Sequence, residues 1–147
     1  MLTIRLAAAI AWGVVLSACA NPPSKVAHPE VATDPYLVRW QSLSRQVDRL
    51  ESTVEGVAYE HELIAVHNVF WPDVARKCNS EAQNEPVERF SAIAVIDHDG
   101  IITEFLPKPN STQFQCYTTE MIGRHYPKPP ISPFYERYQI AIRPPVK

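Results

Sequence analysis

Phe90-Ser-Ala-Ile-Ala-Val-Ile96 is followed by Asp97-His-Asp-Gly100 and Ile101-Ile-Thr-Glu-Phe-Leu106, and this stretch decides the fold. The two flanking runs are rich in β-branched and apolar residues, which is typical of half-buried strands. An Asp-Gly step between apolar runs is a strong hairpin signal, because glycine tolerates the positive φ that such turns need. The stretch therefore predicts an antiparallel hairpin.

A helix and a third strand are predicted after the hairpin. Ser111 or Thr112 can cap the helix. Its apolar residues recur at helical spacing: Phe114, Tyr117 and Met121. Pro127-Lys-Pro-Pro130 ends it, because proline cannot donate a backbone hydrogen bond and disfavours helix in the residue before it. Tyr138-Gln-Ile-Ala-Ile142 alternates large apolar with smaller or polar residues, as a strand does.

These elements, in this order, resemble the C-terminal periplasmic domain of the TolA and TonB proteins, and the TolA version fits better. The resemblance rests on the turn at Asp99-Gly100, a helix that carries Cys116, and Tyr126-Pro-Lys-Pro-Pro130. Phe134-Tyr135-Glu136 and a final strand ending in Arg143-Pro144 complete it. It covers about the C-terminal half of the chain and extends back to residues 59–71, which look like the first helix of that family.

The resemblance implies an α+β fold over residues 59–147, with two or three helices on one face of a small three-stranded antiparallel sheet. It also implies partner capture by β-strand addition, because a small sheet has an open edge that accepts a strand. The expected binding strand consists of Tyr138, Gln139, Ile140, Ala141 and Ile142, with Gln139 and Ala141 pointing outward. Alternatively, Arg143-Pro144 and the N-terminal helix block that edge.

The chain departs from the family in three ways. Residues 79–86 form an insert, and Pro107-Lys-Pro-Asn110 replaces a glycine-rich step before the second helix. We also see no membrane-spanning anchor helix to couple the domain to a motor. We therefore expect an adaptor or accessory subunit rather than an energy transducer.

The N-terminus has the pattern of a bacterial lipoprotein signal. Arg5 precedes an apolar run, and Leu16-Ser-Ala-Cys19 resembles the lipobox. We expect residues 1–18 to be removed and Cys19 to be acylated, so that the chain is anchored to a membrane. The alternative is an ordinary signal peptide cut near Ala20. Because Ala20 stands where aspartate marks retention in the inner membrane, we expect the outer membrane, facing the periplasm. Residues 19–35 are proline-rich and predict an extended tether.

The two remaining cysteines would lie in an oxidising compartment, where paired thiols usually form a disulfide. The resemblance supports a bridge between Cys78 and Cys116, because TolA-type domains also tie this helix back with one. A metal site or a redox thiol is the alternative, but the chain has no Cys-x-x-Cys pair and no clustered His and Cys spacing.

Residues 36–58 carry a heptad-like pattern that continues to residue 64. Its apolar positions alternate by three and four, with His61 on the same seam between the last two: Tyr36, Trp40, Leu43, Val47, Leu50, Val54, Val57 and Ile64. The pattern fits a coiled coil that makes a homo-oligomer, or one amphipathic helix laid on the domain's own sheet. Gly56 weakens a single unbroken rod. Trp71-Pro72 is expected to close or kink the following helix, with a loop over residues 79–88.

Composition excludes some functions and leaves others open. The chain has 147 residues, 46% of them hydrophobic, and a formal net charge of −2. One packed domain with appendages fits this length, and the charge gives no basic field for nucleic acid. His61-Glu62 lacks the second histidine of a zinc-protease motif, and we find no phosphate-binding loop or nucleophile motif. We expect no cofactor, no metal and no catalysis.

The sequence therefore predicts a non-catalytic outer-membrane lipoprotein that binds another envelope protein through a TolA/TonB-like domain. It would serve as adaptor or accessory subunit of a transport or secretion complex. Two other functions stay open: a structural coiled-coil lipoprotein, and an envelope enzyme acting on peptidoglycan.

Overall fold

A computed structural model describes residues 34–142 of the chain. The elements, in order, are α1 (Pro35–Leu50), α2 (Val54–Ala82), β1 (Arg89–Ile96), β2 (Ile102–Lys108), the 3₁₀ turn η1 (Thr112–Phe114), α3 (Gln115–Met121) and β3 (Phe134–Ala141). The strands form one antiparallel sheet in the order β2-β1-β3. The α+β class, with a three-stranded antiparallel sheet and three helices, is confirmed. The predicted signal peptide and Cys19 lie outside the described residues.

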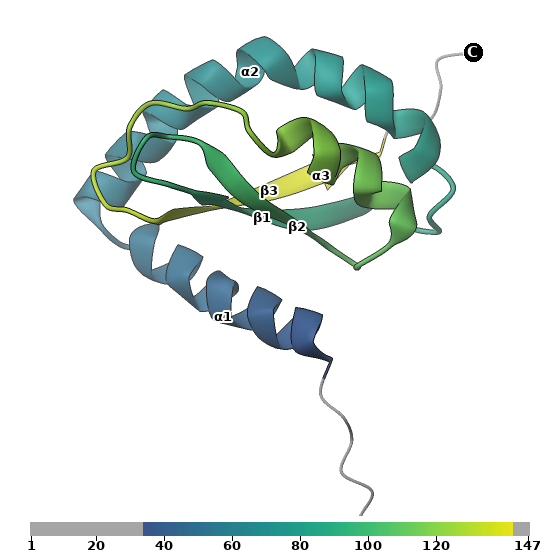
Figure 1. The fold of residues 1–147 in the computed structure, drawn as a ribbon, viewed down its shortest axis with the longest axis horizontal. Coiled ribbons are helices and arrows are strands. Elements are labelled where there is room, and N and C mark those ends of the chain that lie inside the picture. Colours follow the sequence, from purple (N-terminus) through teal and green to yellow (C-terminus); the bar gives the residue numbers. More distant parts are fainter. Residues whose placement is uncertain (1–33, 143–147) are drawn as a thin grey trace, which may run out of the picture. The chain divides into compact units, whose positions relative to one another are not determined.

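Helices cover both faces of the sheet, so the prediction that they pack on one face is wrong. Figure 1 shows α1 below the sheet, with α2 and α3 above it. The reason lies in β1, which is buried over most of its length. Phe90 points toward α3, whereas Ile93 and Val95 form a second cluster with Leu43 and Val47 of α1. A central strand that is apolar on both faces needs two layers of helix.

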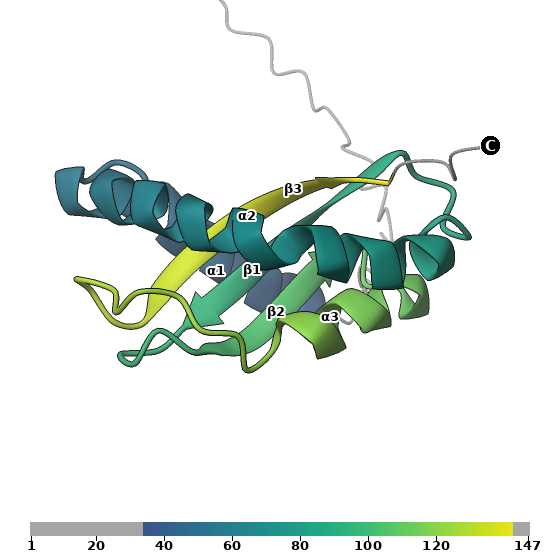
Figure 2. The ribbon, with the colours of Figure 1, turned by 90° about the horizontal axis from the view of Figure 1, so that it is seen from above.

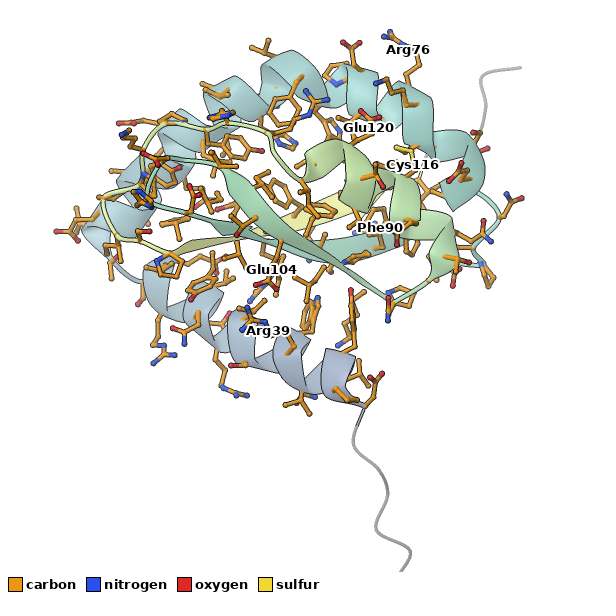
Figure 3. The ribbon with its side chains drawn as sticks, in the orientation of Figure 1. Arg39, Arg76, Phe90, Glu104, Cys116 and Glu120 are labelled. Carbon is orange, nitrogen blue, oxygen red and sulfur yellow. A yellow bond between two sulfur atoms is a disulfide. The ribbon has the colours of Figure 1, made fainter. Side chains whose placement is uncertain are left out.

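Polar contacts hold α1 to both edge strands. Arg39 pairs with Glu104 of β2 at 2.6 Å, and Figure 3 shows where the two side chains lie between α1 and the sheet. On the other side of α1, Arg137 of β3 donates to the Ser44 hydroxyl at 2.9 Å and pairs with Asp48 at 2.6 Å. An exposed ion pair contributes about 0–1 kcal/mol, so the apolar cluster supplies most of the attachment.

The heptad pattern is divided between two helices. α1 ends at Leu50, and α2 begins at Val54 with Thr53 as its cap. A side chain at Gly56 would place its Cβ 2.1 Å from the Leu50 carbonyl oxygen, so this close approach requires glycine. In the first part of α2 the buried side chains are Tyr59 and Leu63, and neither belongs to the expected seam. The expected boundary between residues 58 and 59 lies inside α2.

The sequence predicts closure or a kink at Trp71-Pro72, and α2 does not close there. It continues to Ala82, four residues into the expected loop, and it arches over the sheet in Figure 1. After the proline, Val74, Cys78 and Ala82 recur every four residues and are fully buried. Proline in a helix costs about 3 kcal/mol, and burying each apolar side chain gains roughly 1.5–3 kcal/mol. Packing on the sheet therefore outweighs the local preference of the proline.

The predicted hairpin turn is confirmed at Gly100, which has φ of 84°. One Asp97 carboxylate oxygen accepts hydrogen bonds from the backbone N–H groups of Asp99 and Ile101, each at 2.9 Å. An aspartate at the first position of a turn commonly accepts such backbone hydrogen bonds, and here they close the turn. The Asp-His-Asp cluster therefore has a structural role in the turn.

Candidate partner-binding edge

β3 is an edge strand, and within residues 34–142 no other strand pairs with its outer side. Antiparallel residue pairs alternate between hydrogen-bonded and non-hydrogen-bonded pairs. Ile142 donates to the Glu88 carbonyl at 2.9 Å, which makes that pair hydrogen-bonded. By alternation from this pair, Ile140 also directs its backbone groups toward β1, whereas Gln139 and Ala141 direct theirs outward. The open edge therefore presents two N–H and two C=O groups at these two residues.

The opposite edge, on β2, is partly covered. The Ile102 N–H donates to the Arg124 carbonyl at 2.9 Å, and the Ile102 carbonyl accepts from Gly123 at 2.8 Å. Farther along β2, Pro107 has no N–H to donate. β3 is thus the edge at which a further strand finds the more complete set of backbone partners.

A groove of about 650 Å³ runs along this open edge, between α2 and β3. Figure 2 shows β3 beside α2 at the margin of the sheet. Residues 138–141 form the strand side. The helix side consists of His67, Trp71, Pro72, Ala75, Arg76 and Asn79. Arg76 is the one charged side chain in this lining, and it pairs with Asp73 on its own helix. The groove therefore combines aromatic and apolar side chains with polar ones, next to the outward backbone groups of Gln139 and Ala141.

Aromatic rings fix the start of the groove. His67 stacks on Trp71 and on Tyr138, with ring centroids 4.9 and 5.0 Å apart. Its Nδ1 lies 2.8 Å from the Tyr126 hydroxyl, which accepts from the Tyr138 hydroxyl at 3.0 Å. Burial lowers the pKa of His67 to about 4, and burial raises the pKa of both tyrosines. All three side chains are neutral at physiological pH, which suits a rigid binding wall.

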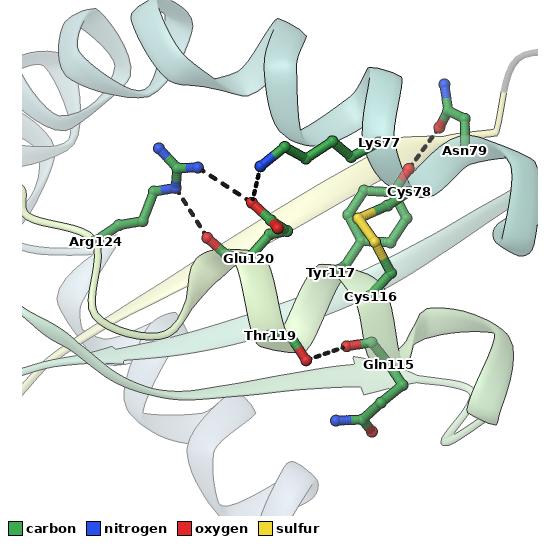
Figure 4. Close-up of a disulfide and its surroundings, with 9 residues drawn as sticks. All are labelled: Lys77, Cys78, Asn79, Gln115, Cys116, Tyr117, Thr119, Glu120 and Arg124. Carbon is green, nitrogen blue, oxygen red and sulfur yellow. Dashed lines mark hydrogen bonds and ion pairs between the residues drawn. A yellow bond between two sulfur atoms is a disulfide. The ribbon is translucent and has the colours of Figure 1, made fainter.

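The predicted disulfide between Cys78 and Cys116 is confirmed, and it fastens α2 to α3 (Figure 4). Cys78 is fully buried. Beside the bridge, the Tyr117 hydroxyl donates to the Asn79 side chain at 2.5 Å. Lys77 pairs with Glu120 at 3.0 Å across the same two helices. These contacts fix the end of α2 that forms one wall of the groove.

The structure brings most of the expected binding residues to one place. Tyr138 and Ile140 are buried toward α2, while Gln139 and Ala141 are exposed, as predicted. Ile142 follows the end of β3 and packs against the core rather than lining the groove. The strand itself begins earlier than expected, at Phe134.

Sequence reasoning missed the helical side of the groove. Its signal was present: His67, Trp71, Ala75 and Asn79 recur every four residues. That spacing places them along one side of a helix. The interruption predicted at Trp71-Pro72 hid the pattern, because it separated Ala75 and Asn79 from the helix that carries His67.

Between residues 34 and 142, no three His, Cys, Asp or Glu side chains gather closely enough to hold a metal ion. In the same part of the chain, no helix combines the length and the apolar character needed to cross a membrane.

No protein-family model matches the chain, and comparison with curated proteins and with solved structures also gives no match.

Proposed function

We propose that the protein is a non-catalytic outer-membrane lipoprotein, facing the periplasm, that binds an extended segment of another envelope protein by strand addition to β3. The observation that carries the proposal is the open outer edge of β3 beside a groove of about 650 Å³. An added strand would hydrogen-bond to Gln139 and Ala141 and place every second side chain in the groove. Main-chain bonds supply affinity in this binding mode, and side-chain pockets supply specificity.

The resemblance to TolA and TonB C-terminal domains supports the same mode, because those domains capture extended segments of their partners. The disulfide gives a rigid wall for such capture, since it holds α2 against α3 next to the groove. We infer that the protein acts as adaptor or accessory subunit of an envelope transport or secretion complex, held by a lipid on Cys19.

Replacing Ala141 by proline tests strand addition directly. The Ala141 N–H faces away from β1, so Ala141→Pro removes an outward donor and leaves the β1–β3 hydrogen bonds in place. A photo-crosslinker at the exposed Gln139 should give one discrete adduct in cells, and Ala141→Pro should abolish that adduct. Ala141→Ser is the matched control and should keep it. A crosslinker at Arg45, exposed on α1, controls for random encounter.

The proposal is wrong if the Gln139 adduct persists in the proline variant while the domain stays folded. It is also wrong if only Arg45 crosslinks. Anchoring is a separate question: Cys19→Ser should leave the chain unlipidated and release it from membrane fractions. Continued membrane retention of the serine variant would contradict the lipoprotein assignment.

The coiled-coil function has one specific observation in its favour. α2 exposes three apolar side chains from the heptad pattern: Val54 at 83%, Val57 at 40% and Ile64 at 43%. A self-association surface would explain them, although single exposed apolar residues are common. Sedimentation of the chain with and without Ile64→Asp separates the two functions. A dimer that this change dissociates would support the coiled coil, whereas a monomer in both cases would support binding at β3.

A further inference from the structure

Strand addition at β3 would place successive side chains of the partner against two different surfaces. A residue opposite Ile140 shares the face of the sheet that α2 covers, and a residue opposite Ala141 shares the face that α1 covers. Because these two positions are consecutive in the partner, each surface sets the chemistry of one residue.

The surface toward α2 fits an aromatic side chain. Tyr138 stacks on His67 of α2. Two residues farther along, about 7 Å, β3 reaches Ile140, and α2 covers the same distance in four to five residues. The partner side chain opposite Ile140 is therefore level with Trp71. Ala75 lies one helical turn beyond Trp71, and its small side chain leaves space in that part of the groove. Aromatic rings favour edge and stacked contacts with other rings, such as that of Trp71.

The surface toward α1 fits a carboxylate. Arg89 is directly opposite Ala141 in the β1–β3 register, and its side chain is exposed. Within residues 34–142 its guanidinium makes no ion pair and no hydrogen bond. An added residue opposite Ala141 would be two strand spacings from Arg89, about 9.6 Å between Cα atoms. Because the side chain of Ala141 is only a methyl group, the long side chain of Arg89 can extend across it toward the added strand.

We infer that the groove selects a partner segment in which an aromatic residue, level with Trp71 and extending over Ala75, is adjacent in sequence to an acidic residue that pairs with Arg89. The inference rests on the proposed strand addition at β3, and it names the chemical class of that partner.

Phage display of random dodecapeptides against the full-length chain in detergent micelles provides the test. Enriched peptides are then synthesised, and their affinity is measured by fluorescence anisotropy. We expect aromatic–acidic neighbours in the enriched peptides. Ala75→Leu, which fills the space in the groove, should weaken binding at least tenfold. Arg89→Glu should weaken it about 3–10-fold, as expected for an ion pair at the rim of an interface. The matched controls are Ala65→Leu and Arg45→Glu, which change exposed helical positions away from the groove.

The outcomes separate this inference from the function on which it rests. One outcome overturns the inference and leaves strand addition standing. In that outcome the enriched peptides lack the aromatic–acidic pair, lose binding to Ala141→Pro, and bind Ala75→Leu and Arg89→Glu as well as the parent chain. Peptides that bind Ala141→Pro as well as the parent chain overturn both. A loss in Arg45→Glu equal to that in Arg89→Glu shows a general charge effect and overturns the assignment of Arg89.

Discussion

Glu136 on β3 carries a buried carboxylate, and replacing this residue should stabilise the domain at alkaline pH. The residue is only 9% exposed. Burial raises its pKa from 4.5 to about 8, and the charges of Glu60 and Glu51 add to the rise, while neighbouring Arg137 opposes it. Because the pKa in the folded state is the higher one, the folded chain keeps a proton that the unfolded chain loses. Stability is therefore greatest below about pH 4.5 and falls as the pH rises through 8.

The magnitude follows from the two pKa values. Each pH unit between them costs about 1.4 kcal/mol, so the ionised carboxylate costs roughly 3–5 kcal/mol by about pH 9. Glutamine has nearly the same shape and no charge. We expect Glu136→Gln to be more stable than the parent chain by roughly that amount at pH 9, and nearly equal to it at pH 4.

Urea unfolding at a series of pH values between 4 and 9 measures this difference, since the free energy of unfolding extrapolates linearly with denaturant. Taking the difference between parent and variant cancels the titration of all other groups. Glu62→Gln is the matched control, because Glu62 is exposed on α2, and its difference should stay near zero. A Glu136→Gln difference that does not change with pH, or a variant less stable than the parent at pH 9, would refute the reasoning.

Three further predictions concern the scaffold. Replacing both Cys78 and Cys116 by serine should lower the free energy of unfolding by about 4 kcal/mol. This value follows from the chain-entropy account for a bridge with a sequence separation of 38. Reductant should shift the urea midpoint of the parent chain and leave that of the serine variant unchanged. Gly100→Ala should destabilise more than Gly123→Ala in thermal melts: both have φ of 84°, but a Cβ at Gly100 would lie 2.2 Å from the Tyr126 carbonyl oxygen, whereas at Gly123 it meets nothing. Leu43→Ala should cost about 2–5 kcal/mol if α1 is part of the core, and a loss below 1 kcal/mol would contradict that packing.

The sheet could be predicted from sequence because its signals are local. The β-branched and apolar runs of β1 and β2, the Asp-Gly turn and the helical spacing of Phe114, Tyr117 and Met121 each lie within a few residues. The layer arrangement could not be predicted in this way. Ile93 and Val95 are apolar, like Ala94 between them, but the pattern of one strand does not say which helix covers which face. That choice depends on contacts between α1 and β1 that are distant in sequence.

The groove shows why a binding site is harder to predict than the strand that forms half of it. The β3 side was found because a strand exposes its pattern in five consecutive residues. The α2 side depends on whether the helix continues past Pro72, and proline locally favours a break in the helix. Burial of Val74, Cys78 and Ala82 on the sheet, with the bridge to Cys116, reverses that preference. The α2 wall of the groove, which would contact a partner's side chains, therefore forms only because packing against the core keeps α2 helical beyond Pro72.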